Sequence, residues 1–235
     1  MKNVFAPVKR ESTRHKVSSA IREAILQGRL KTGQRLTEVP LSRQFGVSRA
    51  VIREALQQLS LEGLLEQSPY QGARVIHLSP EEVEEIIRLR TMLETEAVRQ
   101  AKAKITDEIA QELRTLGEEM KASVEDPSRY TSLDLAFHER LWELSGNKTL
   151  RKMLHQLVVP FFAMGTILRH SRMLQSPERA QSLRQGDHTP LINALCSGTA
   201  EDAVLEMQKH LDGTWRSTRS YLEQFYSATE AESND

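Results

Sequence analysis

Residues 34–59 read QRLTEVPLSRQFGVSRAVIREALQQL, and this stretch decides the fold of the first part of the chain. The pattern predicts a helix over 37–45, a turn at Gly46 and a second helix over 48–59. Two short helices joined by a tight turn are typical of a helix-turn-helix, which lays its second helix in the major groove of DNA. The stretch therefore predicts double-stranded DNA as a partner.

The predicted second helix carries side chains suited to reading DNA. Arg49 and Arg53 are four residues apart, so they share one face of the helix. Arginine is the commonest reader of guanine because its fork donates two hydrogen bonds in one plane. Ser48 stands at the cap, where its hydroxyl can donate to a phosphate that faces the helix N-terminus. Solvated arginines also occur at this spacing on ordinary amphipathic helices, so the prediction depends on the whole unit.

The flanking residues complete a winged helix-turn-helix. A helix is predicted over 13–27, and two short strands over 64–67 and 73–76 enclose a turn that contains glycine. Besides the helix residues, the side chains and backbone that we expect at the DNA are those of Arg35, Gln71, Gly72 and Arg74. The glycine would let the wing approach DNA closely, and the two wing side chains would reach phosphate or the minor groove.

The charge distribution divides the chain at the same place. Residues 1–78 contain 13 Lys and Arg against 6 Asp and Glu, a net charge of +7, whereas residues 79–235 contain 19 against 26, a net charge of −7. Basic charge attracts phosphates through counterion release, so the first part is the expected DNA-binding side. The alternative is a chance asymmetry between two solvated surfaces.

The composition places few other constraints on function. Cys196 is the single cysteine and lies in the apolar run LINALC, so we expect a buried thiol rather than a disulfide. No stretch approaches the roughly 18 uninterrupted apolar residues of a membrane span, and the N-terminus lacks the apolar segment of a signal peptide. We therefore expect a cytoplasmic protein that does not bind membranes.

The remainder of the chain shows helical periodicity without strand alternation. The sequence SPEE at 79–82 combines a serine cap, proline at the first helical position and glutamate three residues after the cap. The predicted helices span 80–103, 106–124, 128–145, 147–173, 178–197 and 199–226. We expect a mainly α protein with a DNA-binding domain over 1–78, an all-helical domain over 79–226 and a disordered tail over 227–235.

Four residues of the helical part suggest a metal site. Asp134 and His138 are four apart on one predicted helix, so a carboxylate and an imidazole share a face. His188 and His210 each lie in a later predicted helix. Three neutral imidazoles and one carboxylate suit a divalent cation, with Zn²⁺ the first candidate and Ni²⁺ or Mn²⁺ the others. Spacing alone leaves open that these are solvated or hydrogen-bonded histidines.

The first third of the chain also resembles the winged helix of the GntR regulators. The matching segments are AILQGRLKTGQRLTE at 24–38, GVSR at 46–49, IREAL at 52–56, EGL at 62–64 and GARV at 72–75. Two positions depart from the family pattern: Thr32 replaces a proline, and Ala50-Val51 replaces Thr-Pro. The second departure lies beside the expected base-reading arginines, so the family's operator sequence is not carried over unchanged.

Residues 80–222 resemble the FCD effector domain of the FadR subfamily. The segments that carry this resemblance are RTMLETEA at 90–97, DLAFHERL at 134–141, HTPLINAL at 188–195 and HL at 210–211. The resemblance implies that Asp134, His138, His188 and His210 hold a metal ion. It also implies a small organic acid bound between the metal and Arg90. An arginine in a helical cavity needs a partner, and an incoming carboxylate is a natural one; permanent pairing with Glu94 is the alternative.

Together these features predict a ligand-responsive transcriptional regulator rather than an enzyme. We expect a homodimer on a palindromic operator, because two recognition helices must reach half-sites about 34–36 Å apart. A small carboxylate or sugar acid would control it. One alternative is a metalloenzyme whose ion activates water, although no second carboxylate or other general base is recognisable near the four ligands. The other is a constitutive DNA-binding protein with a purely structural metal.

Overall fold

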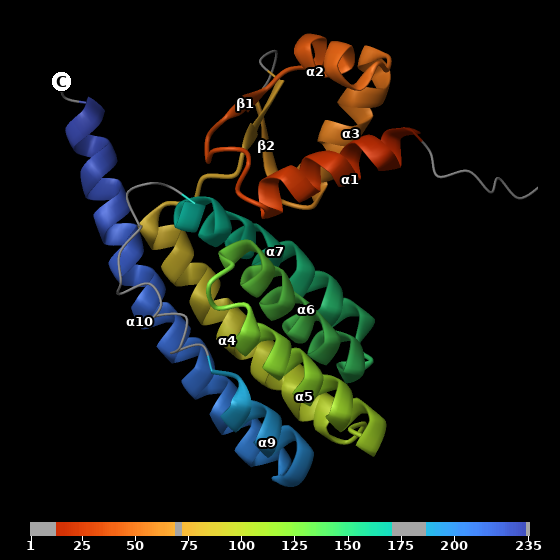
Figure 1. Cartoon of the computed structure of the whole chain (residues 1–235), viewed down its shortest axis with the longest axis vertical. Coiled ribbons are helices and arrows are strands. Elements are labelled where there is room, and N and C mark those ends of the chain that lie inside the picture. Colours follow the sequence, from red (N-terminus) through yellow and green to blue (C-terminus); the bar gives the residue numbers. More distant parts are fainter. Residues whose placement is uncertain (1–12, 69–71, 171–186, 234–235) are drawn as a thin grey trace, which may run out of the picture.

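The structure is a computed structural model, and it describes residues 13–68, 72–170 and 187–233. The protein is mainly α, with a small three-stranded sheet in its N-terminal part. In Figure 1 the N-terminal elements form one unit at the top, and the helices of the remainder lie below it, except that the upper end of α10 rises to one side of this unit. The predicted fold class is confirmed.

The N-terminal unit is a winged helix-turn-helix. Its elements in chain order are α1 (Thr13–Leu26), β1 (Arg35–Leu36), α2 (Glu38–Phe45), α3 (Arg49–Leu61), β2 (Leu65–Ser68) and β3 (Gly72–Val75). Gly46 ends α2 with a φ of 65°, and the Ser48 hydroxyl caps α3 by accepting a hydrogen bond from the Val51 amide at 3.4 Å. The local signals that predicted the turn and the cap are therefore the ones that form them.

The strand β1 was not predicted. It pairs antiparallel with β3 at the edge of a sheet of order β1-β3-β2. Two residues are too few to show the period-two pattern of a strand, so only pairing across the fold reveals it. Thr32 stands where the GntR pattern has proline. Its hydroxyl donates to the Ile76 carbonyl at 2.6 Å, which links the turn before β1 to the residue after β3.

The C-terminal part is a bundle of helices, as expected. Its elements are α4 (Pro80–Lys102), α5 (Asp107–Ala122), α6 (Pro127–Ser145), α7 (Lys148–His170), α9 (Thr189–Ser197) and α10 (Ala200–Ser233). A complete capping box starts α4, because the Ser79 hydroxyl accepts from the Glu82 amide and the Glu82 carboxylate accepts from the Ser79 amide. In Figure 1 α4 and α10 run side by side along the bundle.

Two predicted boundaries of the bundle differ from the structure by more than three residues, and the end predicted at residue 173 lies outside the described residues. The helix predicted over 178–197 begins at Thr189 within the described residues, because Pro190 is accommodated only in a first turn; residues 178–186 lie outside the described part. Helix α10 continues to Ser233, although 227–235 was expected to be disordered. Alanine and glutamate in this segment are good helix formers, so the helix propagates through a polar sequence.

The hydrophobic core has two parts. One cluster lies within the bundle and includes Phe137 and Leu211. The other extends from the winged helix, with Ile21 and Ile52, into the bundle, with Trp142 and Phe161. The DNA-binding unit therefore shares a continuous apolar contact with the helices below it. Among the described helices, none is both long enough and apolar enough to cross a bilayer.

Candidate metal centre and DNA-binding surface

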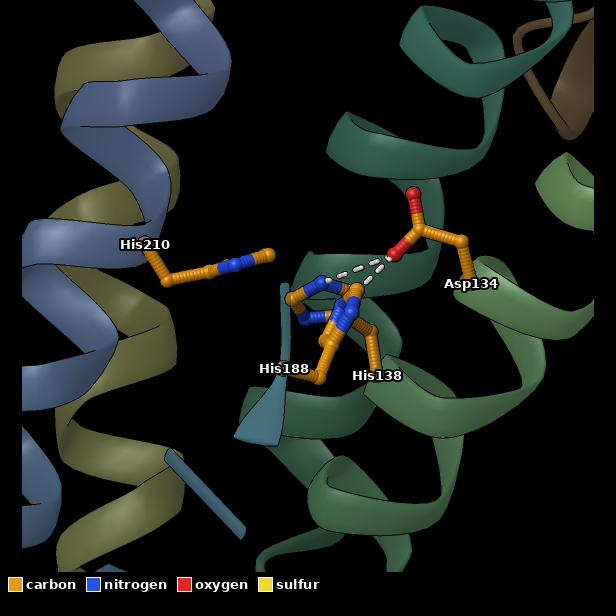
Figure 2. Close-up of side chains that lie close together, drawn as sticks. All are labelled: Asp134, His138, His188 and His210. Carbon is orange, nitrogen blue, oxygen red and sulfur yellow. Dashed lines mark ion pairs between the residues drawn. The ribbon is translucent and has the colours of Figure 1, made fainter. Parts of the chain in front are cut away.

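Four side chains from three elements converge inside the bundle. Asp134 and His138 come from α6, His188 is the residue before α9, and His210 comes from α10. Each offers one ligating atom, and these four atoms all lie within 4.8 Å of one another. Figure 2 shows His210 directed from α10 toward the other three side chains. The structure therefore brings together the four residues that the sequence singled out.

The position of His188 corrects the sequence interpretation. It was expected inside a helix, but it is the N-cap residue of α9 because Pro190 follows so closely. Its ring lies edge-on to Phe137, with ring centroids 4.8 Å apart, and 4.2 Å from the ring of His210. Packing against these two rings thus fixes the imidazole of His188, which lies just outside α9.

The polar atoms of this cluster lack ordinary partners. Asp134 Oδ1, His188 Nε2 and His210 Nδ1 are buried and make no hydrogen bond. Asp134 Oδ1 lies 3.0 Å from His188 Nε2 and 3.5 Å from His138 Nε2, but it is not aligned with either as a hydrogen bond. Buried polar atoms without partners are costly. The donor set therefore fits a divalent cation that would satisfy all of them.

A second carboxylate, that of Glu94 on α4, orients the cluster. Its Oε2 accepts hydrogen bonds from His138 Nδ1 at 2.6 Å and from Trp142 Nε1 at 3.1 Å. With Nδ1 donating to Glu94, Nε2, which faces Asp134, is the atom that holds the lone pair when His138 is neutral. Burial favours that neutral form, but the Glu94 carboxylate raises the pKa of His138, so a metal would have to displace a proton from Nε2. A carboxylate behind a ligating histidine is common at metal sites, where it fixes the tautomer. Sequence reasoning treated Glu94 only as a partner of Arg90.

The electrostatic environment keeps both carboxylates ionised. Burial by itself would raise the pKa of Glu94, but His138 and Arg90 beside it hold the pKa far below its usual range. Burial likewise opposes ionisation of Asp134, yet the His138 and His188 imidazoles hold its pKa well below the ordinary value. Burial, with His188 and His138 nearby, holds the pKa of His210 well below its usual value. A neutral His210 and an ionised Asp134 are the ligand forms that a metal requires.

Arg90 lies beside this cluster and is 1% exposed. Its Nε donates to Glu94 Oε1 at 2.5 Å, so the pairing considered as an alternative is present. Its Nη2 lies 3.2 Å from His138 Nε2, and its guanidinium carbon lies 4.9 Å from the centre of the Phe162 ring. Arg90 is therefore held through Nε, while its Nη2 lies within hydrogen-bond distance of His138 Nε2.

The recognition helix presents the expected residues at the surface. Ser48, Arg49 and Arg53 are all exposed at or near the start of α3. Arg53, however, forms a two-pronged ion pair with Glu38 of α2, at 2.6 and 2.8 Å. Hydrogen bonding from Arg53 lowers the pKa of Glu38, so the carboxylate stays ionised. Sequence reasoning did not foresee that this arginine has a partner within the motif.

The sheet presents two of the other predicted DNA-binding side chains. Arg35 and Arg74 are directly opposite each other on β1 and β3, and both are exposed. Two positive charges directly opposite each other repel, so a bound anion would stabilise this pair of arginines. Arg74 also donates to the Gly33 carbonyl at 3.2 Å. Gln71 lies outside the described residues.

The fold itself requires glycine at position 72, whether or not DNA is bound. Its φ is +87°, and a Cβ there would lie 2.5 Å from the Leu36 carbonyl oxygen. Only glycine allows β3 to approach β1 at this point. The structure therefore accounts for this glycine by strand pairing, and close approach to DNA stays a prediction.

A winged helix-turn-helix followed by a helical bundle with a buried ligating cluster defines a class of protein, the two-part transcription regulators. Residues 13–75 match the bacterial regulatory proteins of the gntR family, and residues 85–213 match the FCD domain. The chain belongs to the gntR family of transcriptional regulators and carries an FCD domain.

Similar proteins support this assignment. The gluconate operon transcriptional repressor of Bacillus licheniformis is 34% identical over 60% of this chain and 59% of its own. The Uxu operon regulator of Haemophilus influenzae is 30% identical over 90% of this chain and 83% of its own. The chain spans 62% of another relative, the uncharacterized regulator YdhC of Bacillus subtilis. The fold matches that of E. coli McbR/YncC, with a TM-score of 0.67 and 23% identity over 95% of this chain and 99% of that one.

Proposed function

We propose that this protein is a metal-dependent transcriptional regulator that responds to a small carboxylate. The observation that carries the proposal is the cluster of Asp134, His138, His188 and His210, in which three buried ligating atoms have no hydrogen-bond partner. Zn²⁺ is the first candidate for this nitrogen and oxygen donor set, and Ni²⁺ and Mn²⁺ also suit it. When bound, the metal would supply a Lewis-acidic contact for a carboxylate oxygen.

The charges of the buried groups favour an anionic ligand. Glu94 and Asp134 contribute two negative charges and Arg90 one positive charge to the same buried region. A divalent cation would leave this region with a net positive charge, which one carboxylate would neutralise. Arg90 is the natural contact, because a guanidinium donates to carboxylates in a planar fork.

The name of one relative points to the same chemical class. It refers to gluconate, a sugar acid with one carboxylate. A hydroxylated carboxylate has the donors and acceptors that a polar buried site requires. We therefore expect a small carboxylate or sugar acid as the effector of this protein.

The DNA target is proposed to be a palindromic operator bound by a homodimer. Each subunit would present Ser48, Arg49 and Arg53 to the major groove, with Arg35, Gln71, Gly72 and Arg74 beside them. Two recognition helices must reach half-sites about 34–36 Å apart, so the arrangement of the two winged helices decides affinity. An effector controls binding only if it prefers one arrangement over the other.

The test is thermal unfolding of metal-loaded and chelated protein with a panel of small carboxylates and sugar acids. A ligand at 100 times its dissociation constant should stabilise the loaded protein by about 2.7 kcal/mol. Arg90→Lys keeps a cation beside Glu94 but loses the fork, so it should bind the metal and lose most of the ligand response. Arg88→Lys is the matched control, because Arg88 lies on the same helix but is exposed and paired with Glu84. If chelation unfolds the protein and no ligand shifts the loaded form, the metal is structural and the proposal fails.

A further inference from the structure

A cavity of about 560 Å³ lies where the winged helix meets the bundle. Its lining includes residues of α1 and α3 on one side and of α6 and α7 on the other. Figure 1 shows α1 lying above α7 at this junction. Binding sites for small ligands are commonly 300–1,000 Å³ in volume and often lie between domains, as a general range. We propose that this cavity is a second ligand site, for an amphipathic carboxylic acid that also carries a hydrogen-bond donor.

The apolar part of the lining comes from both sides of the junction. Leu26 and Leu61 contribute from the winged helix, and Leu135 and Val159 contribute from the bundle. Leu61 is 78% exposed. A ligand with an apolar body would cover this leucine and remove apolar surface from water.

The charged part of the lining leaves one cation available. Arg22 pairs with Glu62 at 2.8 Å, and His155, which forms an ion pair only when protonated, lies 3.2 Å from Glu139. Lys152 also lines the cavity, and within the described ranges it forms no ion pair or hydrogen bond. Lys152 is therefore the cation of the lining that is complementary to a ligand carboxylate.

A buried amide supplies a second recognition element. The Nε2 of Gln58 donates to Glu62 at 3.2 Å, so the orientation of the amide is defined. Its Oε1 is buried and accepts no hydrogen bond. A carbonyl oxygen without a donor is costly, so a ligand that brings an N–H or O–H group gains by satisfying it. The proposed ligand carries a hydrogen-bond donor because this oxygen needs one.

The cavity is distinct from the metal cluster, although helix α6 contributes to both. Leu135 and Glu139 each follow a metal-cluster residue directly, so they lie on a neighbouring face of the helix. A ligand in the cavity would contact both α3 and α6, and would therefore stabilise one arrangement of the DNA-binding unit on the bundle. The site would provide a second input to DNA binding.

The first experiment is a fluorescence titration of the full-length protein with 8-anilinonaphthalene-1-sulfonate, an amphipathic anion with an N–H donor. One site per chain is expected. Gln156→Trp places a large side chain at an exposed lining position and should abolish binding without affecting the fold. Lys152→Gln should weaken binding about two- to fivefold, the usual worth of one exposed charge pair. Lys148→Gln, one turn earlier on α7 and outside the lining, is the matched control and should bind as the wild type does.

The second experiment identifies the chemical class by displacement of the probe. Aryl-alkanoic acids that carry a hydroxyl or amide should displace it, and their methyl esters should do so at least several-fold more weakly. Chelation of the metal should leave the titration unchanged, whereas the effector response of the proposed metal site requires the metal. The proposal is overturned if folded Gln156→Trp protein binds the probe with wild-type affinity and stoichiometry, or if esters and acids displace it equally.

Discussion

Glu94 Oε2 accepts a hydrogen bond from His138 Nδ1 at 2.6 Å, with both side chains buried. The same carboxylate accepts from Arg90 through its other oxygen. One acidic group thus fixes the tautomer of a proposed metal ligand and neutralises the arginine proposed to bind the effector. The stability of the bundle, and the metal affinity that we propose, should therefore depend on a residue outside the set of four proposed ligands.

Replacement of Glu94 by glutamine should affect both properties. The variant keeps the size of the side chain but leaves Arg90 buried without a counter-charge, which generally costs about 3–5 kcal/mol. Loss of the carboxylate behind His138 should lower metal affinity about 10- to 100-fold. Urea denaturation and a zinc titration against a competing chelator measure the two effects.

The control for this variant is Glu96→Gln on the same helix. Glu96 is exposed and lies 3.5 Å from Arg99, so its loss should change stability by less than about 1 kcal/mol. Wild-type metal affinity in Glu94→Gln protein would show that the carboxylate does not orient the site.

The local part of this architecture could be predicted from the sequence. Gly46 and Ser48 act within their own turn, and Asp134 and His138 are one helical turn apart, so near neighbours in the sequence carry the information. The role of Glu94 could not be predicted in the same way, because its histidine partner is 44 residues away on another helix. The short strand β1 escaped prediction because a partner 39 residues away defines it.

The ion pair between Arg53 and Glu38 should limit DNA binding. Glu38→Gln should release the guanidinium for the base edges and raise discrimination between bases, by at most about the 5- to 150-fold that one arginine contact supplies. Arg53→Ala should instead reduce discrimination between bases about 5- to 150-fold. Fluorescence anisotropy with DNA selected by the wild-type protein measures both.

Glu54→Gln separates release of the arginine from a simple change of net charge. Glu54 is exposed on the same helix and has no partner among the described residues. Its neutralisation should raise affinity slightly and leave discrimination between bases unchanged. Equal discrimination by Glu38→Gln and Glu54→Gln protein would mean that Arg53 does not reach the base edges when released.

Gly72 should be essential to the wing for steric reasons. In Gly72→Ala the new Cβ would meet the Leu36 carbonyl, so β1 and β3 should separate and Arg35 and Arg74 should lose their register. Gly33→Ala is a matched control, because Gly33 also has positive φ but has open space around it. Backbone strain of about 1–2 kcal/mol is common to both variants, and Gly72→Ala should show a further loss of stability and weaker DNA binding. Equal losses in the two variants would refute the steric argument.

Gly63 provides a direct test of the contact between the DNA-binding unit and the bundle. It follows α3 with a φ of +75°, and a Cβ there would lie 2.8 Å from Cγ of Pro160 on α7. Gly63→Ala should therefore force the two units apart, and the single calorimetric transition expected from their continuous core should split in two.

A double-mutant cycle with Pro160→Ala separates the two causes of the change, since removal of the proline ring relieves the clash but not the backbone strain. Restoration of a single transition in the double variant would place the coupling at this contact. Two transitions in both variants would instead assign the effect to the backbone of Gly63 alone.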